Sequence, residues 1–599
     1  MDSILNKIQE LLIEKGIEEV ERKAFIQQLQ AELKGKKYGL VWENKIEKVS
    51  EQLKTHIPYL TEVEEKRLTA SPEDETHHLL IEGDNLEAVT LLQTTHKGGV
   101  NVCCIDPPYN RGKNDFIYND VFVDQEDSYR HSKWLSFMQK RLLLAYELLA
   151  DNGVVFINIG EDEFARLNLL CQEIFGKDNV EIIIWNKISD EGSAGQGKMK
   201  VTHRFRLDHE YVIVAYKDKS VTKFNKPLMK KEFKNEYKNI DDDIRGDWIS
   251  CELCKSEAKS KVGGKNYYSI TTPSGRVLSR QWHFSETEFY ELDADNRIYW
   301  GNGNIIPRLK KFVNEQHPIT PTSIISGITQ TDGENDLLDI FKKKVFSYPK
   351  PVELIKWLLK IGSDKNDLIL DFFAGSGTTG QAVIELNNED GGNRRCILCT
   401  NNEVSEDKQK KYFCLNSDQL KEYSQTEEYE KRVREPKFQS LGICQAVTYK
   451  RLEAVINGYA SYQGKDIAGL PANLHYYKIN TIPKVNNSTD NAAEYLTKGI
   501  EIIGIKENAF NREDFKEYCI LSNKDKVILV YLEPFVLGHE VIEISKKLKG
   551  YEQSQKIIYS TMTDVVVHGV EVKEYPQEIL EQINRIQEIL KQWEDETGE

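Results

Sequence analysis

The sequence of 599 residues contains no hydrophobic run close to the ~20 residues that a membrane-spanning helix requires. Its first residues, MDSILNKIQELL, carry charges in a helical pattern and do not resemble a signal peptide. The ten cysteines follow no spacing of a disulfide framework, which is typical of proteins in a reducing compartment. We therefore expect a cytoplasmic protein that makes no contact with a membrane.

Positive charge is not in excess over the whole chain. The net charge is −16, which argues weakly against binding to nucleic acid. The local balance matters more, and residues 185–280 contain 20 Lys and Arg against 13 Asp and Glu. With 39% hydrophobic and 29% charged residues, the composition is that of a globular protein too long for one hydrophobic core.

Strand-like apolar runs alternate with helical patterns in two separate parts of the chain, residues 79–216 and residues 351–400. Alternation of this kind predicts a doubly wound α/β sheet. The alternation stops between residues 187 and 346, so a separate domain is expected between the two halves of the sheet. Short strands and a final helix are expected towards the end of the chain, at 500–505, 527–532, 556–560, 565–567 and 577–593.

The turn Asp106-Pro107-Pro108-Tyr109 is the first candidate site. It follows a predicted buried strand, and the two prolines end that strand because they fix φ and have no N–H for the ladder. The backbone carbonyls there lie beside a carboxylate and an aromatic ring, at the carboxyl end of a strand, where open α/β sheets bind ligands. Such acceptors and such a stacking face suit a flat base with an exocyclic amino group. An ordinary strand-ending turn is the alternative interpretation.

A second turn, Asp371-Phe372-Phe373-Ala374-Gly375-Ser376-Gly377-Thr378-Thr379, lies between a predicted strand and a predicted helix. Its glycines let the backbone approach a ligand closely and turn sharply into the helix. The glycine spacing differs from the dinucleotide fingerprint, and no Lys follows Gly377 as a phosphate-binding loop would require. The turn therefore favours a nucleoside cofactor without phosphates, and S-adenosylmethionine is the obvious candidate.

Together the two turns resemble those of amino-group DNA methyltransferases with the permuted, beta-type order of motifs. In that family the target-base motif precedes the cofactor motif, and the recognition domain lies between them. Other similar segments are Gly83-Asp84-Asn85, where Asn85 is expected to cap a helix, His209-Glu210-Tyr211 and Lys350-Pro351-Val352-Glu353-Leu354. The segments KYGLVWE (37–43), YSITTPSGRVLSRQWHF (268–284) and NLHYYK (473–478) resemble more closely the modification subunits of Type III restriction-modification systems.

The resemblance implies methyl transfer from S-adenosylmethionine to the N6 atom of an adenine that has left the double helix. In the family, enzymes with aspartate at the first position of this motif mostly methylate adenine. The implied catalytic residues are Asp106, Pro107, Pro108 and Tyr109, in which Asp106 and the Pro107 carbonyl accept hydrogen bonds from the amino group and Tyr109 stacks on the base. The implied cofactor-binding residues are Asp84, Asp106, Lys350, Pro351, Asp371, Phe373, Gly375, Ser376, Gly377, Asn402 and Glu403.

Basic residues of the insertion are candidates for contacts with DNA phosphates. They are Arg204, Arg206, Lys230, Lys231, Lys259, Lys261, Arg276 and Arg280. We expect no metal, because Cys251 and Cys254 form only half of a zinc site. Cys396 and Cys399 are three apart on a predicted strand and therefore face opposite sides.

The predicted fold is α/β, a permuted doubly wound Rossmann-like methyltransferase sheet with an inserted target-recognition domain and a smaller C-terminal α/β domain. The predicted parts are a helical arm (1–60), the first half of the core (61–217), the insertion (218–346), the second half of the core (347–403), a helical connector (404–475) and the C-terminal domain (476–599). The implied partners are double-stranded DNA, a second copy of the chain and an ATP-dependent restriction subunit. The alternatives are a stand-alone N4-cytosine or RNA methyltransferase, or a recognition module that mainly guides a separate nuclease.

Overall fold

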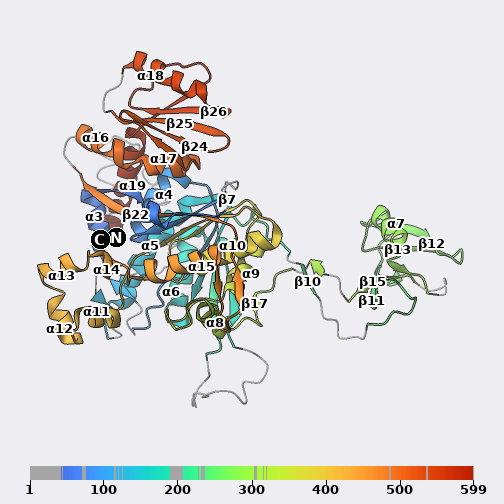
Figure 1. Cartoon of the computed structure of the whole chain (residues 1–599). Coiled ribbons are helices and arrows are strands. Elements are labelled where there is room, and N and C mark those ends of the chain that lie inside the picture. The colour runs from blue at the N-terminus through green and yellow to red at the C-terminus, as the bar shows by residue number, and fades with distance from the viewer. Residues whose placement is uncertain are drawn as a thin grey trace, which may run out of the picture. The chain divides into compact units, whose positions relative to one another are not determined.

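The computed structural model describes residues 42, 45–70, 76–112, 116–118, 121–123, 126–188, 205, 207–226, 228–230, 237–301, 306–313, 316–318, 320–484, 488–533 and 537–597. They belong to two compact units, one drawn from residues 1–224 and 322–599 and the other from residues 225–321 (Figure 1). The predicted N-terminal arm lies mostly outside the described residues, and its described end is helix α3 (Lys48–Thr55). Among the described residues, no helix is both long and apolar enough to cross a membrane.

The larger unit is built on a mixed sheet, of which the described residues form eleven strands. Ten of them follow one another in the order β1 (His56–Glu62), β22 (Asn473–Pro483), β3 (His77–Glu82), β19 (Arg395–Thr400), β18 (Leu368–Asp371), β4 (Val100–Ile105), β7 (Leu149–Ile159), β9 (His209–Tyr216), β8 (Val180–Asn186) and β17 (Ile324–Ile325). The eleventh, β2 (Leu68–Thr69), pairs with β22. The six strands from β22 to β7 run parallel, whereas β9 is antiparallel to both of its neighbours. The predicted doubly wound sheet is confirmed, and the strands of its second half, β19 and β18, lie between β3 and β4 of the first half.

Helices cover both faces of this sheet. One face carries α4 (Asn85–His96), α5 (Arg130–Leu148) and α6 (Glu161–Phe175). The opposite face carries α9 (Val352–Gly362), α10 (Thr378–Asp390) and α15 (Lys450–Asn457). Successive strand residues point to opposite faces, so Leu79 and Ile81 pack on the first face and Leu80 on the second. Because both faces of the sheet are buried, its strands are continuous apolar runs in the sequence.

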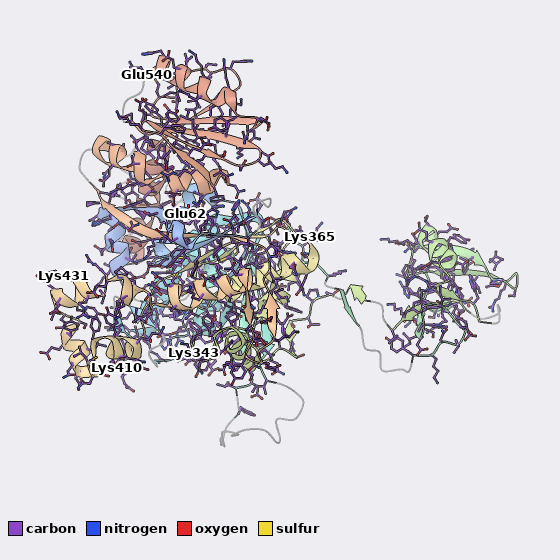
Figure 2. The ribbon with its side chains drawn as sticks, viewed as in Figure 1. Glu62, Lys343, Lys365, Lys410, Lys431 and Glu540 are labelled. Carbon is purple, nitrogen blue, oxygen red and sulfur yellow. The ribbon has the colours of Figure 1, made fainter. Side chains whose placement is uncertain are left out.

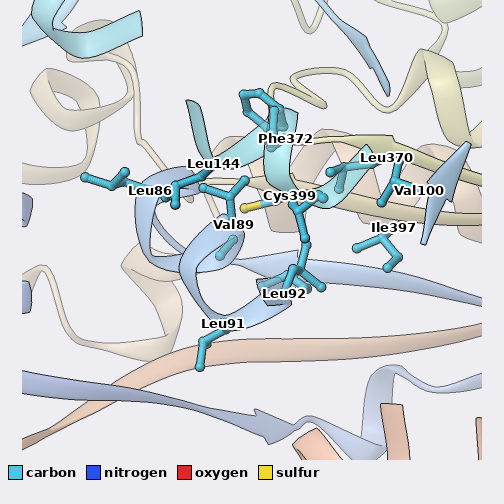
Figure 3. Close-up of a cluster of buried hydrophobic side chains, with 14 of the residues drawn as sticks. Leu86, Val89, Leu91, Leu92, Val100, Leu144, Leu370, Phe372, Ile397 and Cys399 are labelled. Atoms are coloured by element: carbon cyan, nitrogen blue, oxygen red, sulfur yellow. The ribbon is translucent and has the colours of Figure 1, made fainter. Parts of the chain in front are cut away.

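Figure 3 shows the first face, where side chains of α4, β4, β18 and β19 come together. The labelled residues of these elements are Leu86, Val89, Leu91, Leu92, Val100, Leu370, Ile397 and Cys399. At the start of α4, the prediction that Asn85 caps the helix was wrong by one residue. Asp84 is the cap, because its Oδ1 accepts a 2.7 Å hydrogen bond from the N–H of Leu86. Asn85 is instead the first helical residue, and its Nδ2 donates to the carbonyl of Phe372 at 3.0 Å.

The chain after β19 forms the helical connector, in which Figure 2 labels Lys410 and Lys431. Its helices are α11 (Glu406–Phe413), α12 (Ser417–Tyr423), α13 (Glu427–Arg432) and α14 (Pro436–Gln439). A π-helical turn, Cys444–Tyr449, then leads directly into α15. The chain returns to the main sheet as β22.

The C-terminal part contains a second sheet of five strands. Its order is β23 (Asn511–Asp514), β24 (Tyr518–Ser522), β25 (Lys526–Tyr531), β26 (Gln555–Ser560) and β27 (Glu571–Glu574). The strands predicted near 527–532 and 556–560 and the last helix, α19 (Gln577–Thr597), are confirmed. The strand predicted at 500–505 was wrong, because these residues begin helix α17 (Ile500–Glu507). No strand forms at 565–567, where Val567 makes only a single bridge to Val570.

The smaller unit, residues 225–321, has a core of its own. It contains the hairpin β12 (Tyr267–Thr271) and β13 (Val277–Gln281), the three-stranded sheet β11 (Trp248–Glu252), β15 (Arg308–Phe312) and β14 (Ile298–Tyr299), and helix α7 (Glu286–Ala294). Trp282 and Phe289 pack in the centre of this core, with ring centroids 5.1 Å apart. The predicted insertion, 218–346, extends beyond this unit, because β17 and helix α8 (Gln330–Phe341) belong to the larger one.

Candidate active site

The carboxyl ends of β4 and β18 form the candidate active site. These strands are adjacent and parallel, so the turns that begin at Asp106 and after Asp371 leave the same edge of the sheet. The chain then continues to α5 on one face and to α10 on the other, which defines the switch point where open α/β sheets bind ligands. A pocket lies there, between the two turns. Its lining includes Asp106, Lys350, Asp371, Phe373, Gly375 and Ser376.

A buried lysine, Lys350, holds the carboxylate of Asp106. Its Nζ lies 2.9 Å from each carboxylate oxygen and donates a hydrogen bond to Oδ2. The same Nζ is 3.6 Å from Oε2 of Glu210, so one ammonium group serves two carboxylates. Oδ1 of Asp106 is buried, and its 2.9 Å contact with this ammonium is an ion pair that lacks hydrogen-bond geometry. The carboxylate faces the pocket, which Asp106 and Lys350 both line.

The charges of this cluster depend on one another. Burial raises the pKa of Asp106 above its ordinary value, although Lys350 opposes that rise. Burial would also raise the pKa of Glu210, but the charges of Lys350 and Lys187 outweigh it and lower that pKa to about 2. The two carboxylates in turn raise the pKa of Lys350, against the effect of its burial. Glu210 and Lys350 are consequently both charged at neutral pH.

Contacts with four residues hold the side chain of Tyr109 in place. Its hydroxyl donates a 2.9 Å hydrogen bond to Oε2 of Glu210, and only 8% of the residue is exposed. Gly160 lies so close to the ring edge that a Cβ atom there would come within 2.8 Å of Cδ2. The Lys350 ammonium and the Arg111 guanidinium lie over the ring, 4.9 and 4.7 Å from its centroid. Glu210 and Arg111 thus belong to the site, although the sequence alone assigned neither of them a role.

The carbonyl groups of the first turn differ in their partners. Nδ2 of Asn158 donates to the carbonyl of Ile105 at 3.3 Å, and Nε1 of Trp134 donates to the carbonyl of Pro108 at 2.7 Å. Between them, the carbonyl of Pro107 receives no hydrogen bond from any described residue. The turn therefore has two acceptors on neighbouring residues, this carbonyl and the Asp106 carboxylate that Lys350 holds.

The glycine-rich turn has a backbone that only glycine adopts easily. Gly375 has φ of 49° and Gly377, which precedes α10, has φ of 80°. Asp371 ties this turn together, because its carboxylate accepts hydrogen bonds from the Thr379 hydroxyl at 2.6 Å and from the Phe373 N–H at 2.9 Å. Burial raises the pKa of Asp371 to about 7, although these hydrogen bonds oppose the rise.

A buried arginine that the sequence did not reveal supports the glycine-rich turn from α15. Nη1 of Arg451 donates to the carbonyl of Ser376 at 3.3 Å and to the hydroxyls of Ser376 and Thr378 at 3.1 and 2.8 Å. Its Nε donates to Oε1 of Gln381 at 2.6 Å. One helical turn earlier, the Thr448 hydroxyl donates to the carbonyl of Gly375 at 2.6 Å. The shape of the pocket therefore depends on residues about 75 positions further along the chain.

We expect Arg451→Met to lower the free energy of unfolding by about 2–4 kcal/mol, because it leaves several buried acceptors without a donor. Urea unfolding of the full chain measures this change. Lys450→Met is the matched control, since the exposed Lys450 pairs only with Glu453 on the helix surface, and its effect should stay within about 0.5 kcal/mol. Equal stability of the Arg451 and Lys450 variants would show that α15 does not hold the turn.

Some residues assigned to the cofactor do not line this pocket. They are Asp84, Pro351, Gly377, Asn402 and Glu403. Asp84 caps α4 and lies 3.4 Å from Nη2 of the buried Arg141. Both polar atoms of the Asn402 side chain form hydrogen bonds within the protein. Nδ2 donates to the carbonyl of Gln439 at 2.7 Å, and Oδ1 accepts from the N–H of Gln445 at 3.1 Å. Pro351 and Gly377 precede the first turns of α9 and α10.

The candidate DNA-contacting residues differ in their exposure. Lys259, Lys261 and Arg276 are exposed in the smaller unit. Arg280 is only 8% exposed, and its Nη2 donates to Glu257 at 2.7 Å. Four of these predictions fall outside the described residues or on an undescribed side chain: Arg204, Arg206, Lys230 and Lys231.

The acidic prolyl turn lies beside the glycine-rich turn at the switch point of a doubly wound sheet, which is where α/β enzymes bind their ligands. The model of the DNA methylase family matches residues 100–407, slightly more than half of the chain, and the chain belongs to this family.

Individual relatives match similar lengths of the chain. The Mod subunit of the Type III restriction-modification enzyme StyLTI from Salmonella typhimurium is 34% identical over 55% of this chain and 53% of its own length. The EcoPI Mod subunit from Escherichia phage P1 is 30% identical over 63% and 65%. The Type II methyltransferase M.KpnI from Klebsiella pneumoniae is 29% identical over 60% and 88%. The chain thus spans only about half to two thirds of the Type III relatives.

Proposed function

We propose that this protein is an S-adenosylmethionine-dependent DNA methyltransferase that modifies the N6 atom of adenine in a specific sequence. The observation that carries the proposal is the carboxylate of Asp106, with the acceptor carbonyl of Pro107 next to it in the chain, in a pocket that Asp106 lines together with the glycine-rich turn. Two acceptors on adjacent residues match the two hydrogen atoms of an exocyclic amino group. Membership of the DNA methylase family supports the same reading.

The lining of the pocket fits the proposed cofactor. The glycine backbone at 375 permits close approach, and the side chain of Phe373 provides an apolar surface. Neither turn offers the lysine and backbone arrangement of a phosphate site, which agrees with a nucleoside that carries no phosphate. When bound there, S-adenosylmethionine supplies an electrophilic methyl group.

The residues of the chain then act on the amino group. The lone pair of adenine N6 is delocalised into the ring, which makes the nitrogen a poor nucleophile. Hydrogen bonds to Asp106 and to the carbonyl of Pro107 favour a tetrahedral nitrogen and stabilise the positive charge that develops during transfer. Burial raises the pKa of Asp106, Lys350 opposes that rise, and Glu210 holds Lys350 and Tyr109 in place.

We also propose a biological role and partners for this chain. Similarity to Type III Mod subunits over 55% and 63% of the chain supports a role as the modification and specificity subunit of such a system, acting on double-stranded DNA as a homodimer with an ATP-dependent restriction subunit. The similarity to M.KpnI keeps open the alternative of a stand-alone methyltransferase. A cytoplasmic location follows from DNA as the proposed substrate.

The smaller unit is the proposed reader of DNA, and the salt dependence of binding tests this assignment. We expect replacement of the exposed Lys259, Lys261 and Arg276 together by alanine to weaken DNA binding and to reduce the slope of log K against log salt concentration by about two to three. Fluorescence anisotropy with duplex DNA at several salt concentrations measures the slope. Replacement of three exposed lysines of the connector, Lys411, Lys421 and Lys431, is the control. An unchanged slope in the first variant would place the DNA path elsewhere.

The proposed function itself is tested in cells. The chain is expressed in a bacterial host without modification systems, and the host genome is sequenced by a method that detects modified bases. We expect N6-methyladenine in one recurrent sequence context. Modified cytosine, or no modified base with soluble protein present, would refute the proposal.

A further inference from the structure

An exposed tyrosine, Tyr348, is next in sequence to residues that line the pocket. It lies in sequence between Phe346 and the segment Pro349-Lys350, all of which line the pocket. Tyr348 is 61% exposed, whereas Pro349 and Lys350 are buried. Its φ of 57° lies in the left-handed region, which is unusual for an aromatic residue. Strained backbone of this kind concentrates at functional sites.

The chain that follows Tyr348 is anchored from two helices. Nε2 of Gln330 on α8 donates to the carbonyl of Pro349 at 3.1 Å, and the Thr378 hydroxyl on α10 donates to the carbonyl of Lys350 at 3.3 Å. Gly333 of α8 lies so close that a Cβ atom there would come within 2.3 Å of the Pro349 carbonyl oxygen. This packing fixes the backbone and holds the ring of Tyr348 outside the packed interior. Figure 2 labels Lys343, which follows α8 on the way to this segment.

A planar group lies over both Tyr348 and Tyr109. The Arg111 guanidinium carbon is 4.7 Å from the centroid of the Tyr109 ring and 5.8 Å from that of Tyr348. Its Nη2 is 3.8 Å from Oε1 of Glu210, so the same guanidinium also approaches the carboxylate that holds Tyr109. A guanidinium is flat and stacks on aromatic faces much as a nucleobase does. The two tyrosine rings are therefore placed where a flat group can lie against both.

We infer that Tyr348 is the second aromatic wall of the target-base site, opposite Tyr109. The extruded base takes the place of the Arg111 guanidinium, with its amino group directed to Asp106 and the carbonyl of Pro107. Arg111 then moves towards the phosphate of the extruded nucleotide, which is the anion nearest to the base and a good bidentate partner for arginine. This inference rests on the proposed function and adds the residue that holds the base on its outer side.

Three substitutions of Tyr348 in the full-length chain separate stacking from backbone effects. Tyr348→Phe keeps the ring, Tyr348→Ala removes it, and Tyr348→Gly removes it while relieving the left-handed backbone. Each is assayed for single-turnover transfer of labelled methyl to unmethylated plasmid DNA, and for S-adenosylmethionine binding by calorimetry. Tyr462→Ala, which removes a tyrosine of equal exposure at 60%, is the control.

We expect Tyr348→Phe and Tyr462→Ala to transfer methyl groups within about twofold of the unmodified chain. Tyr348→Ala and Tyr348→Gly should be slower by about ten- to a hundredfold, the cost of losing one stacking partner, with unchanged S-adenosylmethionine affinity. Normal transfer by the Ala and Gly variants, or loss of cofactor binding in parallel with transfer, would overturn the inference alone. Absence of transfer by the unmodified chain would overturn the proposed function and this inference together.

Discussion

Asp106→Ala is expected to reduce single-turnover methyl transfer by about a hundredfold or more, the scale for removing one preorganised polar partner of a developing charge. The hydrogen bond from the amino group to Oδ1 of Asp106 is stronger in the transition state than in the ground state, so the loss falls mainly on the chemical step. The variant should still fold, because Lys350 retains Glu210 as a partner 3.6 Å away. It should also still bind S-adenosylmethionine.

Rapid-quench transfer of labelled methyl to unmethylated DNA measures this effect, with calorimetry of cofactor binding on the same preparations. Asp106→Asn is the matched variant, because it keeps the shape and one acceptor oxygen but loses the charge. We expect its rate to fall between those of Asp106→Ala and the unmodified chain. Near-normal transfer by a folded Asp106→Ala chain would mean that the first turn is only structural.

Lys350→Met has the second largest expected effect, and this effect depends on pH. Burial and Glu210 raise the pKa of Asp106, and Lys350 is the cation that opposes them at 2.9 Å. Loss of such a partner typically raises a carboxyl pKa by about one to three units. Only the ionised carboxylate of Asp106 has the negative charge that stabilises the positive charge developing on the amino group. Transfer is therefore lost as the pH falls through this pKa, and the loss should begin at higher pH in the variant.

The measurement is the single-turnover rate between pH 5.5 and 9.5. We expect the acidic limb of the Lys350→Met profile to move upward by about one to three pH units, with recovery of part of the rate at alkaline pH. Lys343→Met is the control, since Lys343 is exposed nearby and has no carboxylate of the pocket among its contacts. Superimposable profiles for the two variants would exclude a role of Lys350 in the ionisation of Asp106.

The sheet could be predicted from the sequence because its strands are buried on both faces and read as short apolar runs between turn residues. The run at 500–505 has the same appearance, yet it forms helix α17. A short apolar run alone cannot distinguish a buried strand from a buried helix, because a fully buried element has no polar face to show its period. The local sequence pattern therefore could not predict that residues 500–505 form a helix.

The two turns of the site could also be predicted, because proline and glycine constrain the backbone locally. The contacts that complete the site could not. Lys350 reaches Asp106 across 244 residues, and Arg451 reaches Ser376 across 75. The resemblance placed Asp106 and Lys350 in the same site but did not predict their direct contact, and nothing in the sequence around Arg451 indicated its contact with Ser376. Arg451 could be suspected only as a charged residue next to the apolar stripe of a helix. Glu210 lies in the family-like segment His209-Glu210-Tyr211, but the sequence alone assigned it no role.

The most direct test of the central claim is the identity of the methylated base. The purified full-length chain is incubated with labelled S-adenosylmethionine and unmethylated DNA, and the DNA is digested to nucleosides that are separated and analysed by mass spectrometry. The geometry of Asp106 and Pro107 predicts that the label is found in N6-methyladenine and that it disappears with Asp106→Ala. Label in N4-methylcytosine, or in no nucleoside although the chain binds the cofactor and DNA, would contradict the account.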